Sequence, residues 1–189
     1  MPNPQGPVAV HDKAGVDARG LQVGRRLVAA QLALMGVLAL LGGPALLAAL
    51  LPTGAVPFVL AGAAPWVPWA GWTLVLAGIA LGGWAIAANR PGNFNIHPAP
   101  RAGGRMVDAG PYRWIRHPMY GSVLFAGAGC VPAAAAWPAP GLALAGTAWI
   151  ALAAVLAAKA RLEEGWLLRA HPGYAAYRAR TWRFVPGLY

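Results

Sequence analysis

Residues 110–120 read Gly110-Pro-Tyr-Arg-Trp-Ile-Arg-His-Pro-Met-Tyr120, a basic and aromatic run directly before an apolar segment of membrane-spanning length. Pro118 suits the first turn of a helix, where its missing N–H loses no hydrogen bond and its fixed φ is already helical. The run therefore predicts a helix that starts near His117. Because a helix start carries free N–H groups and a partial positive charge, we expect the corner at Arg116 and His117 to hold an anionic group, such as a carboxylate or phosphate, at the membrane–water boundary.

The composition indicates an integral membrane protein. Hydrophobic residues make up 58% of the 189 residues and charged residues 11%, and the mean hydropathy is +0.51. This is too apolar for a soluble globule of that length. The net charge of +10 invites a nucleic-acid partner, but the basic residues do not form the stripe on a soluble fold that such a partner needs. We therefore expect an all-α polytopic protein whose partner is the lipid bilayer, with no nucleic acid bound.

Four apolar segments are long enough to span, since about 20 helical residues cross a hydrocarbon core of about 30 Å. They are residues 27–51, 68–88, 118–136 and 140–158. Gly42-Gly43-Pro44 predicts a kink in the first segment. In the second, Gly78 and Gly82 form a small-xxx-small pair, which indicates either close helix packing or the ordinary frequency of glycine in such spans. A five-span arrangement stays open if the kinked first run and residues 55–64 each cross or re-enter.

The basic residues predict the orientation. All fifteen Lys and Arg residues fall within 13–26, 90–116 and 159–183, and the two loops on the other side carry no charge. Short loops rich in Lys and Arg stay cytoplasmic, so both termini and the long connection before the third span are expected in the cytosol. The Ala-, Gly- and Pro-rich composition suggests a bacterial source and hence the bacterial inner membrane.

Three regions follow from these boundaries. Residues 1–26 are expected to form a cytoplasmic arm, 27–88 the first two spans, and 89–189 a core that holds the polar chemistry. In this core the last span should continue into water until His171-Pro172-Gly173 breaks it, and a second short helix should carry Tyr174 to Trp182. A cytosolic pocket built from residues 89–121 and this C-terminal extension is predicted. Four scattered histidines and the single Cys130 predict no metal site.

The polar residues of the core carry a resemblance to a known family. Gly110-Pro-Tyr, Arg116-His-Pro-x-Tyr-x-Gly121, Glu163-Glu164, Tyr174-x-x-Tyr177 and Thr181-x-Arg183-Phe-x-Pro186, in this order, resemble the isoprenylcysteine carboxyl methyltransferase family and the related membrane phospholipid methyltransferases. The likeness covers about residues 89–189, and the first two spans match only in hydropathy.

This resemblance implies an S-adenosylmethionine-dependent methyltransferase. His117 and Tyr120 would contact the cofactor, Glu163 and Glu164 would close its site, and Arg183 would lie near the acceptor. The implied catalytic residues are Arg183 and Glu164, and the implied cofactor-binding residues are Tyr112, Arg116, His117, Pro118, Tyr120, Glu163, Glu164 and Tyr177.

The charges of S-adenosylmethionine agree with these implied roles. Its carboxylate suits Arg116 and the helix start at His117, and its ammonium and sulfonium suit a carboxylate and aromatic faces. Methyl transfer needs mainly alignment in a dry site, without a metal or covalent nucleophile. The acceptor would be lipophilic, an isoprenoid or lipid-like carboxylate, thiol or amine that enters between the spans. The sequence predicts no particular oligomeric state.

Other interpretations stay open. A membrane NADPH-dependent reductase of the sterol-reductase type has a similar C-terminal arrangement, and a non-enzymatic membrane assembly factor would need no cofactor. Tyr174 and Tyr177 are either interfacial anchors or site residues. Glu163 and Glu164 could instead pair with Arg161 or Lys159 on an exposed helix.

Overall fold

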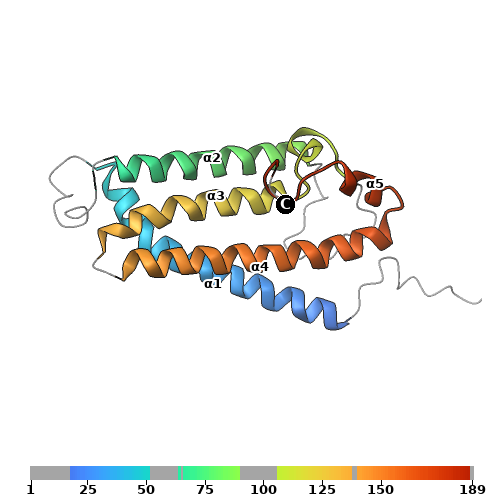
Figure 1. The fold of residues 1–189 in the computed structure, drawn as a ribbon, viewed down its shortest axis with the longest axis horizontal. Coiled ribbons are helices and arrows are strands. Elements are labelled where there is room, and N and C mark those ends of the chain that lie inside the picture. The colour runs from blue at the N-terminus through green and yellow to red at the C-terminus, as the bar shows by residue number, and fades with distance from the viewer. Residues whose placement is uncertain (1–17, 52–63, 65, 90–105, 138–139, 188–189) are drawn as a thin grey trace, which may run out of the picture.

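The computed structural model describes residues 18–51, 64, 66–89, 106–137 and 140–187, and four long helices dominate it (Figure 1). Within the described ranges no β-strand forms beyond one isolated bridge. The elements are α1 (Ala18–Ala48), α2 (Val67–Ala88), η1 (Gly110–Arg113), α3 (Pro118–Ala133), η2 (Ala134–Ala136), α4 (Gly141–Ala170) and α5 (Tyr174–Ala179).

The predicted all-α membrane protein is confirmed. Helices α1, α2, α4 and the segment Pro118–Ala136 are each long and apolar enough to cross a membrane. Large apolar side chains point outward from the bundle, for example Leu40 at 72% exposure and Ile150 at 65%. Such a surface suits lipid, because hydrocarbon tails solvate apolar side chains as well as a protein core does.

Helix α1 starts before the first apolar segment does. The helix begins at Ala18 rather than near Leu27, so Arg25 and Arg26 lie inside it. Leu, Arg, Ala and Gln are good helix formers, and the helix therefore extends past the apolar segment. The rest of the expected arm, residues 1–17, lies outside the described residues, as do residues 55–63 of the five-span alternative and 90–105 of the long connection.

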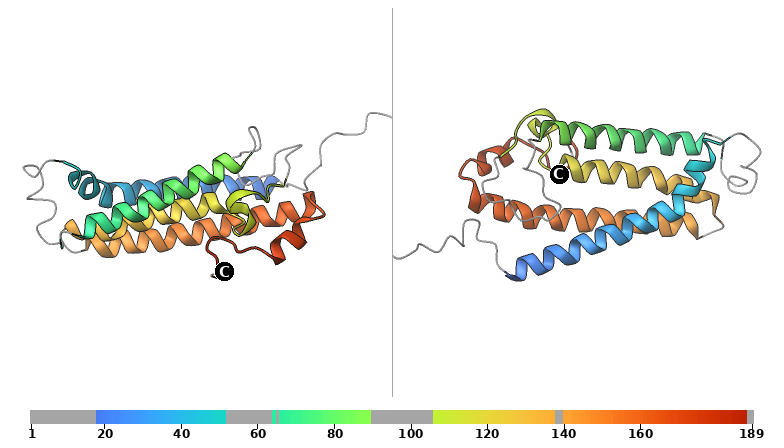
Figure 2. Two further views of the ribbon diagram at one scale, coloured as in Figure 1. Left: turned by 90° about the horizontal axis from the view of Figure 1, so that it is seen from above. Right: turned by 180° about the vertical axis from the view of Figure 1, so that it is seen from behind.

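The other boundaries agree better with expectation. Helix α4 continues past residue 158 and ends at Ala170, directly before the predicted break. Helix α5 ends at Ala179, earlier than the predicted helix through Trp182, because the following residues pair with the chain before α3. Figure 2 shows the last turns of α1, which contain Pro44, bending away from the direction of its first part.

Glycines bring α2 and α3 into close contact. A Cβ on Gly78 would lie 2.6 Å from the carbonyl oxygen of Ser122, and a Cβ on Gly129 would lie 2.4 Å from that of Gly71. Only a hydrogen at these positions lets the two backbones approach this far. Gly83 faces open space, so the glycines of α2 differ in role.

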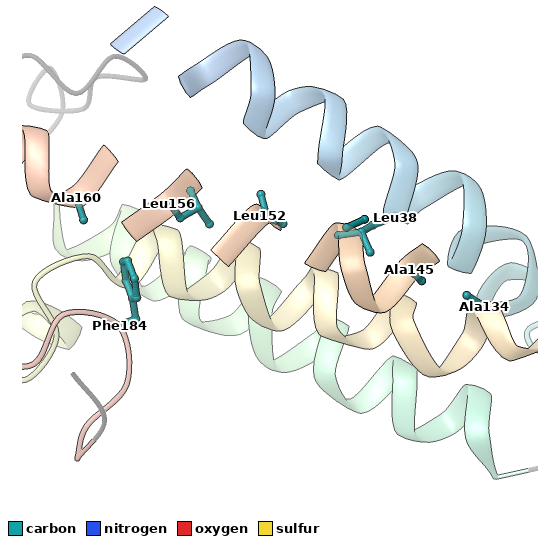
Figure 3. Close-up of a cluster of buried hydrophobic side chains, with 8 residues drawn as sticks. Leu38, Ala134, Ala145, Leu152, Leu156, Ala160 and Phe184 are labelled. Carbon is teal, nitrogen blue, oxygen red and sulfur yellow. The ribbon is translucent and has the colours of Figure 1, made fainter. Parts of the chain in front are cut away.

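The buried core runs along one face of α4. Ala145, Ala148, Leu152, Leu156 and Ala160 recur at helical spacing and meet Leu38 of α1 and Ala134 of η2. Phe184, from the C-terminal segment, joins this row near Leu156 and Ala160 (Figure 3). The C-terminal segment is thereby anchored at the end of the bundle where η1, the start of α3 and α5 also lie (Figures 1 and 2).

Candidate functional site

The motif before α3 lies alongside the C-terminal segment. Ile115 and Trp182 form a parallel bridge. The backbone N–H of Arg116 donates to the Trp182 carbonyl at 2.8 Å, and the N–H of His117 donates to the Arg183 carbonyl at 3.0 Å. In return, the N–H of Trp182 donates to the Trp114 carbonyl at 2.8 Å. Two segments more than 60 residues apart are thus fixed in register.

The start of α3 does not match the expected open anion site. Pro118 is the first helical residue, as predicted, but the backbone N–H groups of Arg116 and His117 already donate to carbonyls of the C-terminal segment. The anionic group at this corner is the carboxylate of Glu164 in the same chain. The anion at this corner is thus a side chain of the protein itself. The two N–H groups already have carbonyl acceptors and are not available to an anionic ligand.

Glu164 is the centre of a buried ion-pair network. Its side chain is 3% exposed, and its Oε1 accepts hydrogen bonds from Arg116 Nε at 3.0 Å and Arg183 Nε at 3.1 Å. Its Oε2 accepts a bond from Arg183 Nη2 at 2.9 Å, and His117 Nε2 lies 3.2 Å from Oε1. Arg178 Nε lies 3.6 Å from Oε2. A buried carboxylate needs such partners, since burying an unpaired charge costs several kcal/mol.

Arg116 also holds the loop that follows α5. Its Nη1 donates to the carbonyl of Arg178 at 3.1 Å and to the carbonyl of Thr181. The Thr181 hydroxyl in turn donates to the Tyr177 carbonyl at 2.7 Å. One guanidinium therefore connects α4 with the loop after α5, and its role in this structure is to position the C-terminal segment.

Glu163 has a different environment from Glu164. Its side chain is 28% exposed. Among the described residues, it accepts a hydrogen bond from the Tyr120 hydroxyl at 2.9 Å, and it lies 3.6 Å from His117 Nδ1. His117 is thus placed between the two carboxylates, and its ring stacks on Tyr120 with 5.2 Å between centroids. Glu163 retains acceptor capacity toward a bound group, whereas Glu164 is surrounded by protein nitrogens.

Tyr112 and Tyr177 are joined by a hydrogen bond. The Tyr177 hydroxyl donates to the Tyr112 carbonyl oxygen at 2.7 Å and so ties α5 to η1. Burial, with a contribution from the charge of Glu163, raises the pKa of Tyr112 to about 12. Burial and the neighbouring Tyr112 raise the pKa of Tyr177 above its ordinary value. Both hydroxyls are therefore protonated donors at neutral pH.

All predicted site residues lie at this end of the bundle, but sequence analysis missed three that join them. Lys159 is buried, donates from Nζ to Gln31 Oε1 at 2.6 Å, and lies 4.8 Å from the Tyr120 ring centroid. Gln31 stood out as the one polar residue of its apolar segment, and Lys159 lies four residues before Glu163 on α4. Arg178, one of the basic residues that predict the orientation, borders Glu164. These residues add α1 to the site.

Cationic, anionic and aromatic side chains converge at this end of the bundle. We call the set His117, Tyr120, Glu163, Glu164, Arg116 and Arg183 the charge cluster. Within the described part of the chain, no three His, Cys, Asp or Glu side chains are grouped closely enough to hold a metal ion.

Comparison with known proteins finds a family match. The model of a family described as a protein of unknown function (DUF1295) matches residues 24–181, which include three of the four long helices entirely and most of the charge cluster. No curated protein and no solved structure matches the chain significantly. Because the match extends over most of the sequence, the chain belongs to the DUF1295 family.

Proposed function

We propose that this protein is an integral membrane S-adenosylmethionine-dependent methyltransferase similar to the isoprenylcysteine carboxyl methyltransferases. The proposal is supported by the way the fold brings three distant stretches of the chain together. Three stretches bear the sequence resemblance, namely residues 110–121, 163–164 and 174–186. They meet in one buried, charged and aromatic cluster at one end of the helix bundle.

The charge cluster suits the three charged groups of this cofactor. Glu163 is partly accessible and can accept a hydrogen bond from the ammonium. The rings of His117, Tyr120 and Phe184 lie 5.2–6.4 Å apart and form an aromatic group beside Glu163, a setting that suits a sulfonium. Cationic side chains outnumber carboxylates around Glu164, which favours the ligand's carboxylate nearby.

The residues of the chain would act chiefly by placement. When bound, S-adenosylmethionine supplies an electrophilic methyl carbon that an acceptor lone pair attacks while the carbon–sulfur bond breaks and its electrons go to sulfur. Enzymes accelerate such a methyl transfer mainly by aligning the acceptor atom with the methyl carbon in a site that excludes water. Glu164 would orient His117 and Arg183 rather than remove a proton, because its oxygens already face protein nitrogens. Arg183 would lie toward the acceptor.

The surroundings of the cluster suggest the acceptor and the topology. The bundle surface is apolar, so we propose a lipophilic acceptor, isoprenoid or lipid-like, with a carboxylate, thiol or amine to be methylated. We further propose that the cluster faces the cytosol of a bacterium from the inner membrane, as the distribution of Lys and Arg predicts.

A reductase is the second candidate. The excess of cationic side chains at the cluster would also suit the phosphates of a nicotinamide cofactor. A membrane NADPH-dependent reductase therefore competes directly with the methyltransferase, and the two differ in which ligand binds.

Calorimetric titration of the detergent-purified protein distinguishes them. S-adenosylmethionine, S-adenosylhomocysteine and NADPH are each added to the wild type, to Glu163→Gln and to Asp108→Asn. We expect saturable binding of the two adenosyl ligands only, and an affinity at least about tenfold weaker in Glu163→Gln, since a charged hydrogen bond is lost. Asp108 is exposed and pairs with Arg180 at 3.6 Å, so its variant should bind as the wild type does. Binding of NADPH alone, or of no ligand, would overturn the methyltransferase proposal.

A further inference from the structure

We infer that the hydroxyl of Tyr174 is a ligand-binding group, which donates a hydrogen bond to an acceptor atom of the polar molecule held at the charge cluster. The identity of that molecule, an adenosyl cofactor, rests on the proposed function. The sequence left two roles open for Tyr174, an interfacial anchor or a site residue. Its buried hydroxyl favours the second role.

The hydroxyl of Tyr174 is buried and has no hydrogen-bond partner among the residues that the structure describes. The residue is 2% exposed, and its ring packs on Tyr177 with 5.7 Å between centroids. Buried polar groups in folded proteins are nearly always hydrogen-bonded, because leaving one unpaired forfeits its hydration without compensation. A hydroxyl of this kind is therefore expected to gain its partner from a bound molecule.

The position of Tyr174 connects that hydroxyl with the charge cluster. Arg178 lies one helical turn after Tyr174 on α5, and its Nε is 3.6 Å from Glu164 Oε2, so α5 borders the charge cluster. Burial, followed by the nearby carboxylates of Glu164 and Glu163, also raises the pKa of Tyr174. The group is thus protonated at neutral pH and acts as a donor. Glu164 cannot readily be its acceptor, since the oxygens of that carboxylate face the nitrogens of Arg116, His117 and Arg183.

Tyr177 provides a matched comparison on the same short helix. The residue is 3% exposed, close to the value for Tyr174, but its hydroxyl donates to the Tyr112 carbonyl oxygen at 2.7 Å. Removal of the Tyr177 hydroxyl therefore breaks a bond within the protein. Removal of the Tyr174 hydroxyl breaks no hydrogen bond with any of the described residues. The two Tyr→Phe variants should consequently behave in opposite ways.

The experiment compares Tyr174→Phe, Tyr177→Phe and the wild type in detergent. Thermal unfolding without ligand is measured first, and S-adenosylhomocysteine is then titrated by calorimetry. We expect Tyr174→Phe to unfold at the wild-type temperature or slightly above it and to bind the ligand about tenfold more weakly, the loss typical of one hydrogen bond in a buried site. Tyr177→Phe should unfold at a lower temperature.

Two results would overturn the assignment of Tyr174 while leaving the proposed function intact. One is wild-type affinity of Tyr174→Phe for S-adenosylhomocysteine, as expected if only water fills the position. The other is a fall in its unfolding temperature as large as that of Tyr177→Phe, which would reveal a partner within the protein. If the wild type binds NADPH instead, the proposed function fails, and the same comparison with NADPH tests Tyr174 separately. Binding of neither ligand overturns both.

Discussion

Arg183 and Glu164 form a buried ion pair with two contacts, at 3.1 Å between Nε and Oε1 and 2.9 Å between Nη2 and Oε2. The pair joins the C-terminal segment to α4, and both side chains are at most 5% exposed. A lysine keeps the charge but cannot supply the planar fork of donors. We expect Arg183→Lys to lower the free energy of unfolding by about 2 kcal/mol.

Denaturant or thermal unfolding in detergent measures this loss, and Arg180→Lys is the control. Arg180 pairs with Asp108 at 3.6 Å with both side chains more than half exposed, so its replacement should leave stability unchanged. Equal stability of both variants would show that the buried pair does not hold the C-terminal segment.

Gln31 and Lys159 should be energetically coupled. Lys159 is buried and its ammonium donates to Gln31 at 2.6 Å across the contact of α1 with α4. Gln31→Leu leaves that ammonium without this acceptor, whereas the double variant Gln31→Leu, Lys159→Met removes both polar groups. The double variant should therefore be more stable than Gln31→Leu alone by at least about 1 kcal/mol. A full double-mutant cycle of unfolding free energies in detergent tests this, and additive effects would contradict the coupling.

Gly78 and Gly83 should respond differently to alanine. A Cβ at position 78 would meet backbone atoms of α3, at 2.6 Å from the Ser122 oxygen and 2.9 Å from the Ala126 nitrogen, and neither can yield without moving the helix. We expect Gly78→Ala to destabilise the protein by about 1–3 kcal/mol. Gly83 has nothing within 4 Å, so Gly83→Ala should be neutral or gain up to about 1 kcal/mol from helix propensity. Thermal unfolding of the two variants side by side gives the comparison, and a reversed order would disprove the proposed α2–α3 contact.

Stability should fall at high pH because of buried tyrosines. The pKa of Tyr112 is about 12 in the folded protein, against about 10 in an unfolded chain. Between these values the unfolded chain loses a proton that the folded protein keeps, so the stabilisation is complete below pH 10 and is lost as pH rises toward 12. The slope is at most about 1.4 kcal/mol per pH unit for one group, and less for the partly exposed Tyr112.

The predicted loss of stability at high pH is tested by measuring the unfolding free energies of the wild type and of Tyr112→Phe from pH 8 to 11. The variant should show a shallower decline above pH 10, while both curves agree at pH 8 apart from a constant offset. Parallel curves throughout would mean that Tyr112 ionises in the folded protein at its ordinary pKa.

Apolar length was sufficient to predict the bundle. The four long helices follow from segments that exceed the thickness of a bilayer, and the ends of α4 follow from Pro140 and the break at His171. The start of α1 was missed because hydropathy marks where a chain can enter hydrocarbon, not where its helix begins. Helix-forming residues such as Arg25 extend α1 beyond that limit.

The sequence named residues that the fold brings together, but it did not predict their partners. The resemblance named both glutamates as one pair, yet Glu164 is enclosed by arginines while Glu163 is partly accessible. That difference arises because the C-terminal segment turns back onto residues 114–117, a contact between distant parts of the chain that no local pattern encodes. The pairing of Lys159 with Gln31 was missed for the same reason.

We propose that the charge cluster at this end of the bundle binds the adenosyl ligand. Hydrogen–deuterium exchange of the detergent-purified protein, with and without saturating S-adenosylhomocysteine, tests its location directly. We expect slower exchange with ligand in peptides that cover residues 112–121, 163–166 and 174–184, and no change in peptides 44–51 and 67–74 at the opposite end of the bundle. Unchanged exchange in all three cluster peptides at saturation, or protection confined to the opposite end, would contradict the claim.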